Sequence, residues 1–378
     1  MKLGRLGPAV AILAGALVTG SRVDAKQIQS VSVDPAFFNP FAGQAVLVAL
    51  VVTSPGSVAL TILDRDGYVI RTIDSQAVSA GVVKIRWDGK DSAGAIVPDE
   101  AYSVRVETKS AAGSEIYEPA KGFVPITENV ASGAYSSVDA VLTYRLARAS
   151  RVHIQAGQVV GESADGTPTG PVLRTIVDRQ PRVAGAVVER WSGFDESGTI
   201  YIPDLRGFGV SVAAMSLPEN SLITTGNRKL SFVEYARKHR PADDQKPRVL
   251  ASSGHQHHQG LTVFEDHSPD LTVAIGGDSK NPTKVKVGSA VRLRINLAAE
   301  SAAYFFAQPA TLLVFVDERT VSTFKTNDNP SDVTIEAKDL AEGVHRIAVN
   351  WASAFGPVAV WAKQIEVTST ELGRRGKP

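Results

Sequence analysis

The chain has 378 residues, of which 43% are hydrophobic and 21% charged, and its formal net charge at pH 7 is +1. This length suggests two or three domains with packed cores. The near-neutral balance excludes a global field that would draw the protein to nucleic acid or anionic membrane. The absence of cysteine excludes disulfides and thiolate sites.

Residues 1–25 have the pattern of a secretion signal. Lys2 and Arg5 form a short basic region, an apolar run follows, and small residues around Ala25 suit signal peptidase. The apolar run is shorter than a bilayer-spanning helix needs. We therefore expect cleavage after Ala25, a mature chain without a transmembrane helix, and a periplasmic or extracellular location at the cell surface. An uncleaved membrane anchor is the alternative.

Residues 26–125 are expected to form a first β-sandwich. Val58, Leu60 and Ile62 alternate with smaller or polar residues, as in a half-buried strand. The Asp-Gly pair at 66–67 suits a tight hairpin. Val, Ile and Thr dominate such stretches, and Gly and Pro separate them, which favours strands over helices.

A turn that starts at a tryptophan occurs twice. Trp87 to Asp99 returns as Trp191 to Asp204, and the spacing of about 100 residues is the length of one β-sandwich. Residues 126–226 are therefore expected to repeat the first module. The positions that persist are those a turn itself needs: an aromatic anchor, glycines, and an acid that bonds backbone amides. The predicted structural turn residues are Trp87, Gly89, Asp91, Gly94, Trp191, Gly193, Asp195 and Gly198. A calcium- or ligand-binding loop is the alternative.

These modules resemble the Ig-like β-sandwich of flagellar hook-capping proteins, which is also appended to many secreted bacterial proteins. The resemblance is carried by Asn39-Pro40-Phe41, Asp64-Arg65-Asp66-Gly67, and Gly81 with Trp87-Asp88-Gly89 through Gly94 to Pro98 and Tyr102. It covers roughly residues 33–108 and, more loosely, 134–214. It implies an all-β fold of tandem Ig-like sandwiches, and such modules serve as spacers, caps and adhesive units. A signal peptide stands where a hook-capping protein has its long rod-binding segment, so the resemblance is to the module alone.

Residues 227–260 are expected to form a basic, His-containing linker that is partly helical and partly irregular. Ser231 and Glu234 have capping-box spacing, which predicts a short helix through His239 before Pro241 stops it. The basic side chains here are candidates for contact with phosphate or an acidic glycan, and a solvated helix face is the alternative. They are Arg228, Lys229, Arg237, Lys238 and Arg240.

Histidines gather at the end of this linker. The candidate metal ligands are His255, His257, His258 and His267. Imidazoles on one segment chelate Cu²⁺, Ni²⁺ or Zn²⁺, whereas the His-Glu-x-x-His pattern of a catalytic zinc helix is absent. A polar linker with adventitious or no metal binding is the alternative.

Residues 261–368 are expected to form a third Ig-like sandwich. Apolar residues alternate over 291–297 and over 347–351, and Leu312–Val316 is a continuous apolar run typical of a buried strand. No tryptophan turn of the repeated kind occurs here. Residues 369–378 form a basic tail.

The sequence contains no nucleophile elbow, phosphate loop, dinucleotide fingerprint or glycosidase acid pair. We therefore expect a protein that is not an enzyme: a secreted structural or interaction protein built from Ig-like modules, acting in cell-envelope or surface assembly or adhesion. Its sheet edges suit a protein partner or self-assembly. An envelope metal-binding protein that uses the His-rich linker and a glycan-binding module are the alternatives. We expect no nucleic-acid partner, and no cofactor beyond Cu, Ni or Zn at the histidines.

Overall fold

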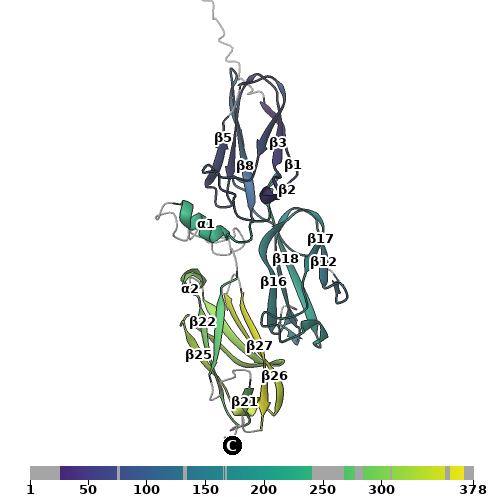
Figure 1. The fold of residues 1–378 in the computed structure, drawn as a ribbon, viewed down its shortest axis with the longest axis vertical. Helices are drawn as coiled ribbons and strands as arrows, with labels where there is room; N and C mark the ends of the chain where they lie inside the picture. The colour runs from purple at the N-terminus through teal and green to yellow at the C-terminus, as the bar shows by residue number, and fades with distance from the viewer. Residues whose placement is uncertain are drawn as a thin grey trace, which may run out of the picture.

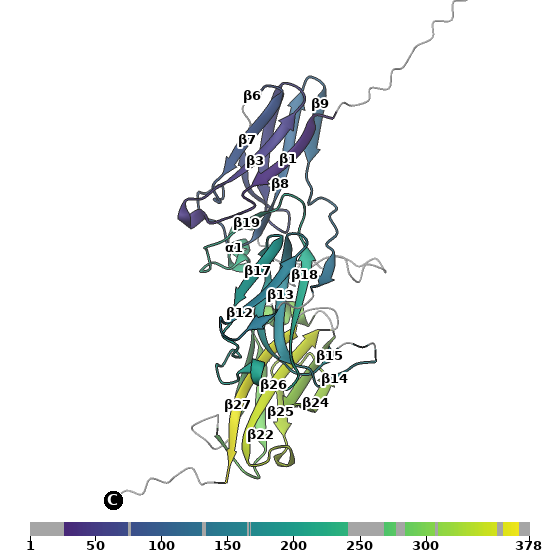
Figure 2. The same ribbon diagram turned by 90° about the vertical axis from the view of Figure 1, so that its right-hand side faces the viewer.

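Three β-sandwiches follow one another along the long axis of the molecule (Figures 1 and 2). The computed structural model describes residues 26–369 except 75–76, 131–133, 165, 167, 241–267, 277–283, 307–308 and 354–357. The all-β class and the tandem Ig-like architecture expected from the sequence are confirmed. No helix within these described ranges is both long enough and apolar enough to cross a bilayer.

The first sandwich packs a three-stranded sheet against a larger one. The small sheet has the order β1 (Ile28–Asp34), β3 (Val46–Val52), β7 (Gly81–Trp87). The large sheet has the order β2 (Phe37–Phe38), β19 (Leu222–Thr224), β8 (Ala101–Ser110), β4 (Gly56–Leu63), β5 (Val69–Ile73), with β6 (Ala77–Val78) on β4 and β9 (Gly113–Tyr117) on β8. A 3₁₀ turn, η1 (Pro40–Ala42), follows β2. Alternate residues of β3 and β4 are buried, as the period of two requires.

The second sandwich repeats this plan. One sheet has the order β10 (Thr127–Asn129), β18 (Phe208–Ser216), β13 (Ser150–Gln158), β16 (Val172–Arg182), and the other has the order β11 (Tyr135–Ser136), β12 (Val141–Leu146), β17 (Gly185–Arg190). The loop inserted between β13 and β16 folds into a small hairpin of β14 (Gly161–Glu162) and β15 (Pro168–Thr169). A 3₁₀ turn, η2 (Ile202–Asp204), ends the second Trp turn.

The third sandwich has its own core. One sheet has the order β20 (Leu271–Gly276), β22 (Val291–Leu297), β25 (Ser331–Ile335), and the other has the order β21 (Lys284–Lys286), β27 (Val358–Thr368), β26 (Gly343–Ser353), β23 (Ala310–Val316), β24 (Arg319–Lys325). Two short helical segments accompany them, α2 (Ala299–Phe305) and η5 (Ala337–Asp339). Trp351 is fully buried at the centre of this core.

The chain returns to the first sandwich after it has built the second. Strand β19 lies within the residues expected for the second module, but it pairs antiparallel with β8 and parallel with β2. Helix α1 (Phe232–His239) follows at once, and the capping box expected from Ser231 and Glu234 is present. Figure 1 shows α1 beside the lower end of the first sandwich. Residues 222–240 are thus part of the first sandwich in space.

The second and third sandwiches are joined by a mixed interface. The side chain of Asn350 binds both backbone polar groups of Val172, accepting from its amide at 2.9 Å and donating to its carbonyl at 2.8 Å. A buried apolar cluster spans the same joint and combines Trp191 with Phe315 and Ala362.

Candidate functional site

The first Trp turn is closed by hydrogen bonds to its own backbone. The Trp87 indole donates to the carbonyl three residues later at 2.9 Å. Asp91 accepts from the amides two and four residues later, at 3.0 and 2.9 Å. Gly89 and Gly94 have φ values of 74° and 82°, in the left-handed region that glycine occupies without strain.

The second Trp turn repeats these contacts. The Trp191 indole again donates to the carbonyl three residues later at 2.9 Å. Asp195 accepts from the amides two, four and five residues later, and Gly193 and Gly198 have φ values of 86° and 70°. In both copies, the aspartate side chain accepts most of its hydrogen bonds from backbone amides of its own turn.

The hairpin between β4 and β5 holds two further carboxylates. Asp64 accepts from the amides of Asp66 and Tyr68, both at 2.9 Å, which fixes the tight turn. Its other oxygen lies 2.6 Å from Nη2 of Arg240, and the same nitrogen lies 2.6 Å from Oδ2 of Asp66. Burial raises the pKa of Asp64, although Arg240 opposes that shift.

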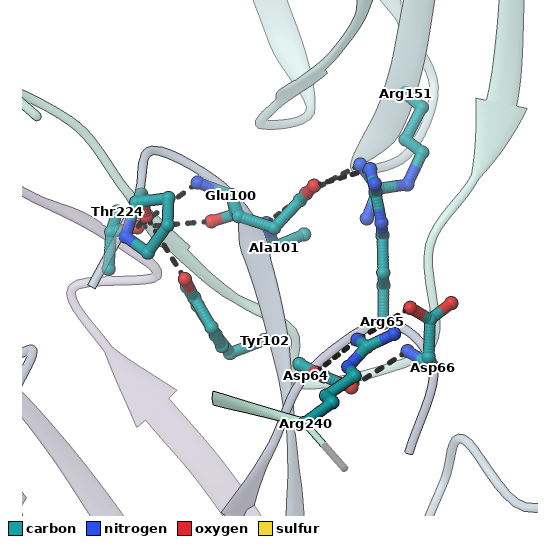
Figure 3. Close-up of polar contacts among 10 residues, drawn as sticks. Asp64, Arg65, Asp66, Glu100, Ala101, Tyr102, Arg151, Thr224 and Arg240 are labelled. Atoms are coloured by element: carbon teal, nitrogen blue, oxygen red, sulfur yellow. Dashed lines mark hydrogen bonds and ion pairs between the residues drawn. The ribbon is translucent and has the colours of Figure 1, made fainter. Parts of the chain in front are cut away.

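A buried carboxylate joins the first two sandwiches (Figure 3). The side chain of Glu100 is only 4% exposed. It accepts from Arg65 of the first sandwich at 2.7 Å, from Arg151 of the second at 2.5 Å, and from the amide of Ala101 at 2.6 Å. Glu100 and Arg65 of the first sandwich and Arg151 of the second therefore form one buried ion cluster across the joint.

Charge pairing keeps Glu100 ionised. Burial by itself would raise the pKa of the Glu100 carboxyl, but Arg151 and Arg65, together with the Ala101 amide, outweigh burial and lower the pKa. A buried pair of this kind is costly to break, because the partner left behind is a buried charge without compensation.

Strand β19 braces the same corner. The Thr224 hydroxyl donates to the carbonyl of Pro98 at 2.7 Å, and it accepts from the amide of Glu100 at 3.2 Å. Tyr102 also donates to the Pro98 carbonyl, at 3.0 Å. The end of the first Trp turn is thus tied to the returning strand and, through Glu100, to the second sandwich.

A cavity of about 360 Å³ lies at this joint. The 64–67 hairpin and the start of β8 form one wall, and the second sandwich contributes Arg151, Arg179 and residues 215–218. Phe123 and Pro125, from the connection between the sandwiches, also line it. Acidic and basic side chains are mixed around it, which suits a joint held by ion pairs more than a site for an ion of one sign.

Helix α1 brings one basic residue into this region and leaves the others outside. The Arg240 side chain, which follows α1, is 8% exposed and lies against Asp64 and Asp66. The other four basic residues predicted as candidate anion contacts are exposed: Arg228, Lys229, Arg237 and Lys238. The anion that Arg240 contacts is therefore supplied by the protein itself.

The predicted metal ligands His255, His257, His258 and His267 lie outside the described residues, so metal binding there stays a prediction. Within the part of the chain that the structure describes, no three His, Asp or Glu side chains are grouped as metal ligands.

Sequence reasoning missed the Glu100 cross-link, although the repeat carries a signal for it. Glu100 follows the first Trp turn directly, and the corresponding residue of the second copy is Leu205. A charge at a position that is apolar in the sister module points to a contact that only one copy makes. Its partner Arg151 could not have been identified, because nothing in the sequence brings residues 100 and 151 together.

Comparison with known proteins identifies the first sandwich. Residues 39–112 match the FlgD Ig-like domain family. The basal-body rod modification protein FlgD of Salmonella typhimurium is 32% identical over 87 residues, which cover 23% of this chain and 37% of that protein. The Escherichia coli protein of the same name is 34% identical over 62 residues, which cover 16% and 27%. The resemblance found in the sequence is thus confirmed for the module.

The likeness does not extend to whole proteins. The crystal structure of FlgD from Pseudomonas aeruginosa matches at 26% identity, covering 20% of this chain and 58% of that one, with a TM-score of 0.19. The chain spans 37% of the length of the Salmonella typhimurium protein and 27% of that of the Escherichia coli protein. These matches identify an FlgD-type Ig-like module at residues 39–112 of this chain.

Proposed function

We propose that this chain is an extracytoplasmic, non-catalytic structural and interaction protein of the cell envelope, whose first two sandwiches act as one body of fixed geometry. The FlgD-type module supports a structural role, since the relatives that contain it are named as proteins that modify the basal-body rod. Hook assembly itself is not part of the proposal.

The observation that carries the proposal is the cross-link through Glu100. Independent domains need no contact across their joint, whereas here Arg151 of the second sandwich binds a buried carboxylate of the first, which Arg65 also binds. Strand β19 adds a second connection, because the chain leaves the second sandwich and pairs into a sheet of the first. Such a joint fixes the angle between neighbours and so presents their outer edges in a set relation.

Those outer edges suit strand addition. Strands β7 and β17 both lie at the edge of a three-stranded sheet, and each carries an exposed valine, Val82 at 66% and Val188 at 60%. An unpaired edge offers backbone amides and carbonyls to an extended segment of a partner or of another copy.

Photo-cross-linking in the native host tests this function. A photoreactive residue at Val82 or Val188 is expected to give a discrete adduct with an envelope protein or with the chain itself, after fractionation places the chain outside the cytoplasm. Glu100→Gln should keep the location and weaken the adduct. Arg71→Ala, which breaks only the half-exposed pair with Asp88, should leave the adduct unchanged. A cytoplasmic chain, or one that gives no adduct at either edge, contradicts the proposal.

A further inference from the structure

The guanidinium of Arg240 occupies a small binding site at the end of the first sandwich. Nη2 lies 2.6 Å from a carboxylate oxygen of both Asp64 and Asp66. The guanidinium carbon lies 4.2 Å from the centre of the Tyr68 ring and 5.3 Å from that of Phe232. Two anions and two aromatic faces thus surround one cation, and its side chain is 8% exposed.

This chemistry selects arginine over lysine. A planar guanidinium stacks on an aromatic face while its N–H groups point at carboxylates, whereas an ammonium is a strongly hydrated point charge that cannot do both. The hairpin that presents Asp64 and Asp66 is fixed by its own hydrogen bonds to the amides of Asp66 and Tyr68. Because those bonds do not involve helix α1, the acidic wall and the Tyr68 face belong to the first sandwich itself.

Helix α1 docks on the first sandwich through few contacts. It has eight residues, too few for a stable helix in isolation. Phe232 and Tyr235 are buried, and Tyr235 donates to Oδ2 of Asp91 at 2.9 Å. Nε2 of His239 lies 3.8 Å from the same oxygen, whereas Glu234, Arg237 and Lys238 are exposed. Within this short segment, the buried contacts with the first sandwich come from the two aromatic residues and Arg240.

The same segment touches the cross-link between sandwiches. The guanidinium of Arg65 lies 3.9 Å above the Phe232 ring, and it is the group that Glu100 binds. Release of α1 would uncover Arg65 at the joint as well as both carboxylates at the hairpin.

We propose that Asp64, Asp66 and Tyr68 form an arginine-recognition site that α1 fills in cis and that accepts, in its place, a helical partner segment carrying two aromatic residues followed by an arginine. The cis segment is then a built-in competitor that keeps the site closed until a partner of that chemistry displaces it. This inference rests on the proposed function only in requiring a protein partner.

A peptide of residues 227–240 provides the probe. The site is emptied in the full mature chain by Phe232→Ala, Tyr235→Ala and Arg240→Ala together, and circular dichroism checks that the sandwiches remain folded. Fluorescence polarisation should show the peptide binding the emptied chain about tenfold or more tighter than the wild-type chain, where α1 competes. The same peptide with Arg240→Lys should bind about tenfold more weakly. Adding Asp66→Asn to the emptied chain should remove that preference and leave the hairpin bonds of Asp64 intact.

Equal binding of the arginine and lysine peptides overturns the proposal, as does an emptied chain that is folded but binds neither. A second measurement is independent of the triple variant. In Arg240→Ala alone, N-acetylargininamide should slow amide exchange over residues 232–239 more than N-acetyllysinamide at the same concentration, and equal effects count against the site. Failure in these tests leaves the cross-linking result for Val82 and Val188 untouched, so the two proposals fail separately.

Discussion

The two Trp turns have the same internal hydrogen bonds and different neighbours. In the first copy, Asp91 leaves Oδ2 available, and Tyr235 of α1 donates to it. In the second copy, the corresponding oxygen of Asp195 accepts from both the amide and the hydroxyl of Ser197. The residue that matches Ser197 in the first copy is Ala93, which has no hydroxyl.

The two turns also have different surroundings. The first turn is covered by a polar helix and its asparagine-containing lead-in, with Asn227 donating to the carbonyls of Ile96 and Val97. The second turn is covered by an apolar face of the third sandwich, in the cluster that combines Trp191 and Ile202 with Phe315. The repeated turn therefore packs against a polar helix in one copy and against an apolar face in the other, and we expect the residues at its rim to contribute to that difference.

Loss of the turn anchors should have the largest effect. Trp87 is fully buried, with edge-on contacts to Phe38 at 5.6 Å and Tyr102 at 5.4 Å. Trp87→Ala should lower the free energy of unfolding of the first sandwich by about 3–5 kcal/mol, measured by urea denaturation with circular dichroism. Hydrogen exchange should show the third sandwich unaffected, whereas Trp191→Ala should loosen it too. Equal loss of protection in the third sandwich from both variants would break the comparison.

Removal of the charge on Glu100 should come next. Glu100→Gln removes the carboxylate that binds Arg65 and leaves the buried Arg151 without the anion it pairs with, and we expect a loss of about 3 kcal/mol in the stability of the joint. Spin labels on the first and second sandwiches should report a broadened distance distribution. The matched control is Asn350→Ala at the second joint, which breaks two neutral hydrogen bonds and should cost about 1–2 kcal/mol.

The same carboxylate predicts a pH dependence. The folded-state pKa of Glu100 lies below its unfolded value, so its contribution is present above the unfolded pKa and is lost as pH falls through the folded pKa. Asp64, whose pKa is raised by burial, contributes with the opposite sign. Stability of wild type minus that of Glu100→Gln isolates the first effect, and this difference should shrink as pH falls. A difference that is constant with pH would show that folding does not shift the pKa of Glu100, and a difference that grows as pH falls would show that Glu100 is neutral in the folded state.

Exchange of the rim residues should have a smaller effect. Ala93 is exposed, so Ala93→Ser fits without a clash and can donate to Asp91 in competition with Tyr235. We expect docking of α1 to weaken by about 1 kcal/mol, seen as faster amide exchange over residues 232–239. Ser197→Ala is the control, and it should leave exchange in α1 unchanged. Equal amide exchange rates of α1 in the two variants would show that the residue at position 93 does not determine how firmly α1 docks.

The alternation of apolar residues and the residues typical of turns predicted much of the fold. The alternation of Val58, Leu60 and Ile62 and the repeated Trp turn were enough to identify sandwiches, and the spacing of Ser231 and Glu234 was enough to predict α1. Strand β19 was not predicted, because three residues are too few to show a period of two. It lies next to β8 because the chain returns to the first sandwich after building the whole second one, and a local sequence pattern does not encode such a return.

The site was harder to predict because it is built from long-range charge pairs. Glu100 finds Arg151 51 positions away, and Asp64 finds Arg240 176 positions away. The sequence analysis predicted that all five basic residues contact an anion, with a solvated helix face as the alternative for the whole segment. The structure divides it, since Arg240 at the end of α1 lies against the hairpin whereas Arg237 and Lys238 in the last turn are exposed. A run of basic residues does not by itself show which side chains face the protein and which face solvent.

That division gives the smallest expected effect. Arg237→Ala with Lys238→Ala removes two exposed cations from α1, and the free energy of unfolding should change by no more than about 0.5 kcal/mol. Arg240→Ala removes one cation and leaves Asp64 and Asp66 facing each other in a buried setting, so it should destabilise several times more. Thermal unfolding at low and high salt separates the two, since screening acts on exposed charges far more than on buried ones. If the double variant proves as damaging as Arg240→Ala, total charge rather than position holds α1 in place, and the contrast between a docked residue and a solvated face fails.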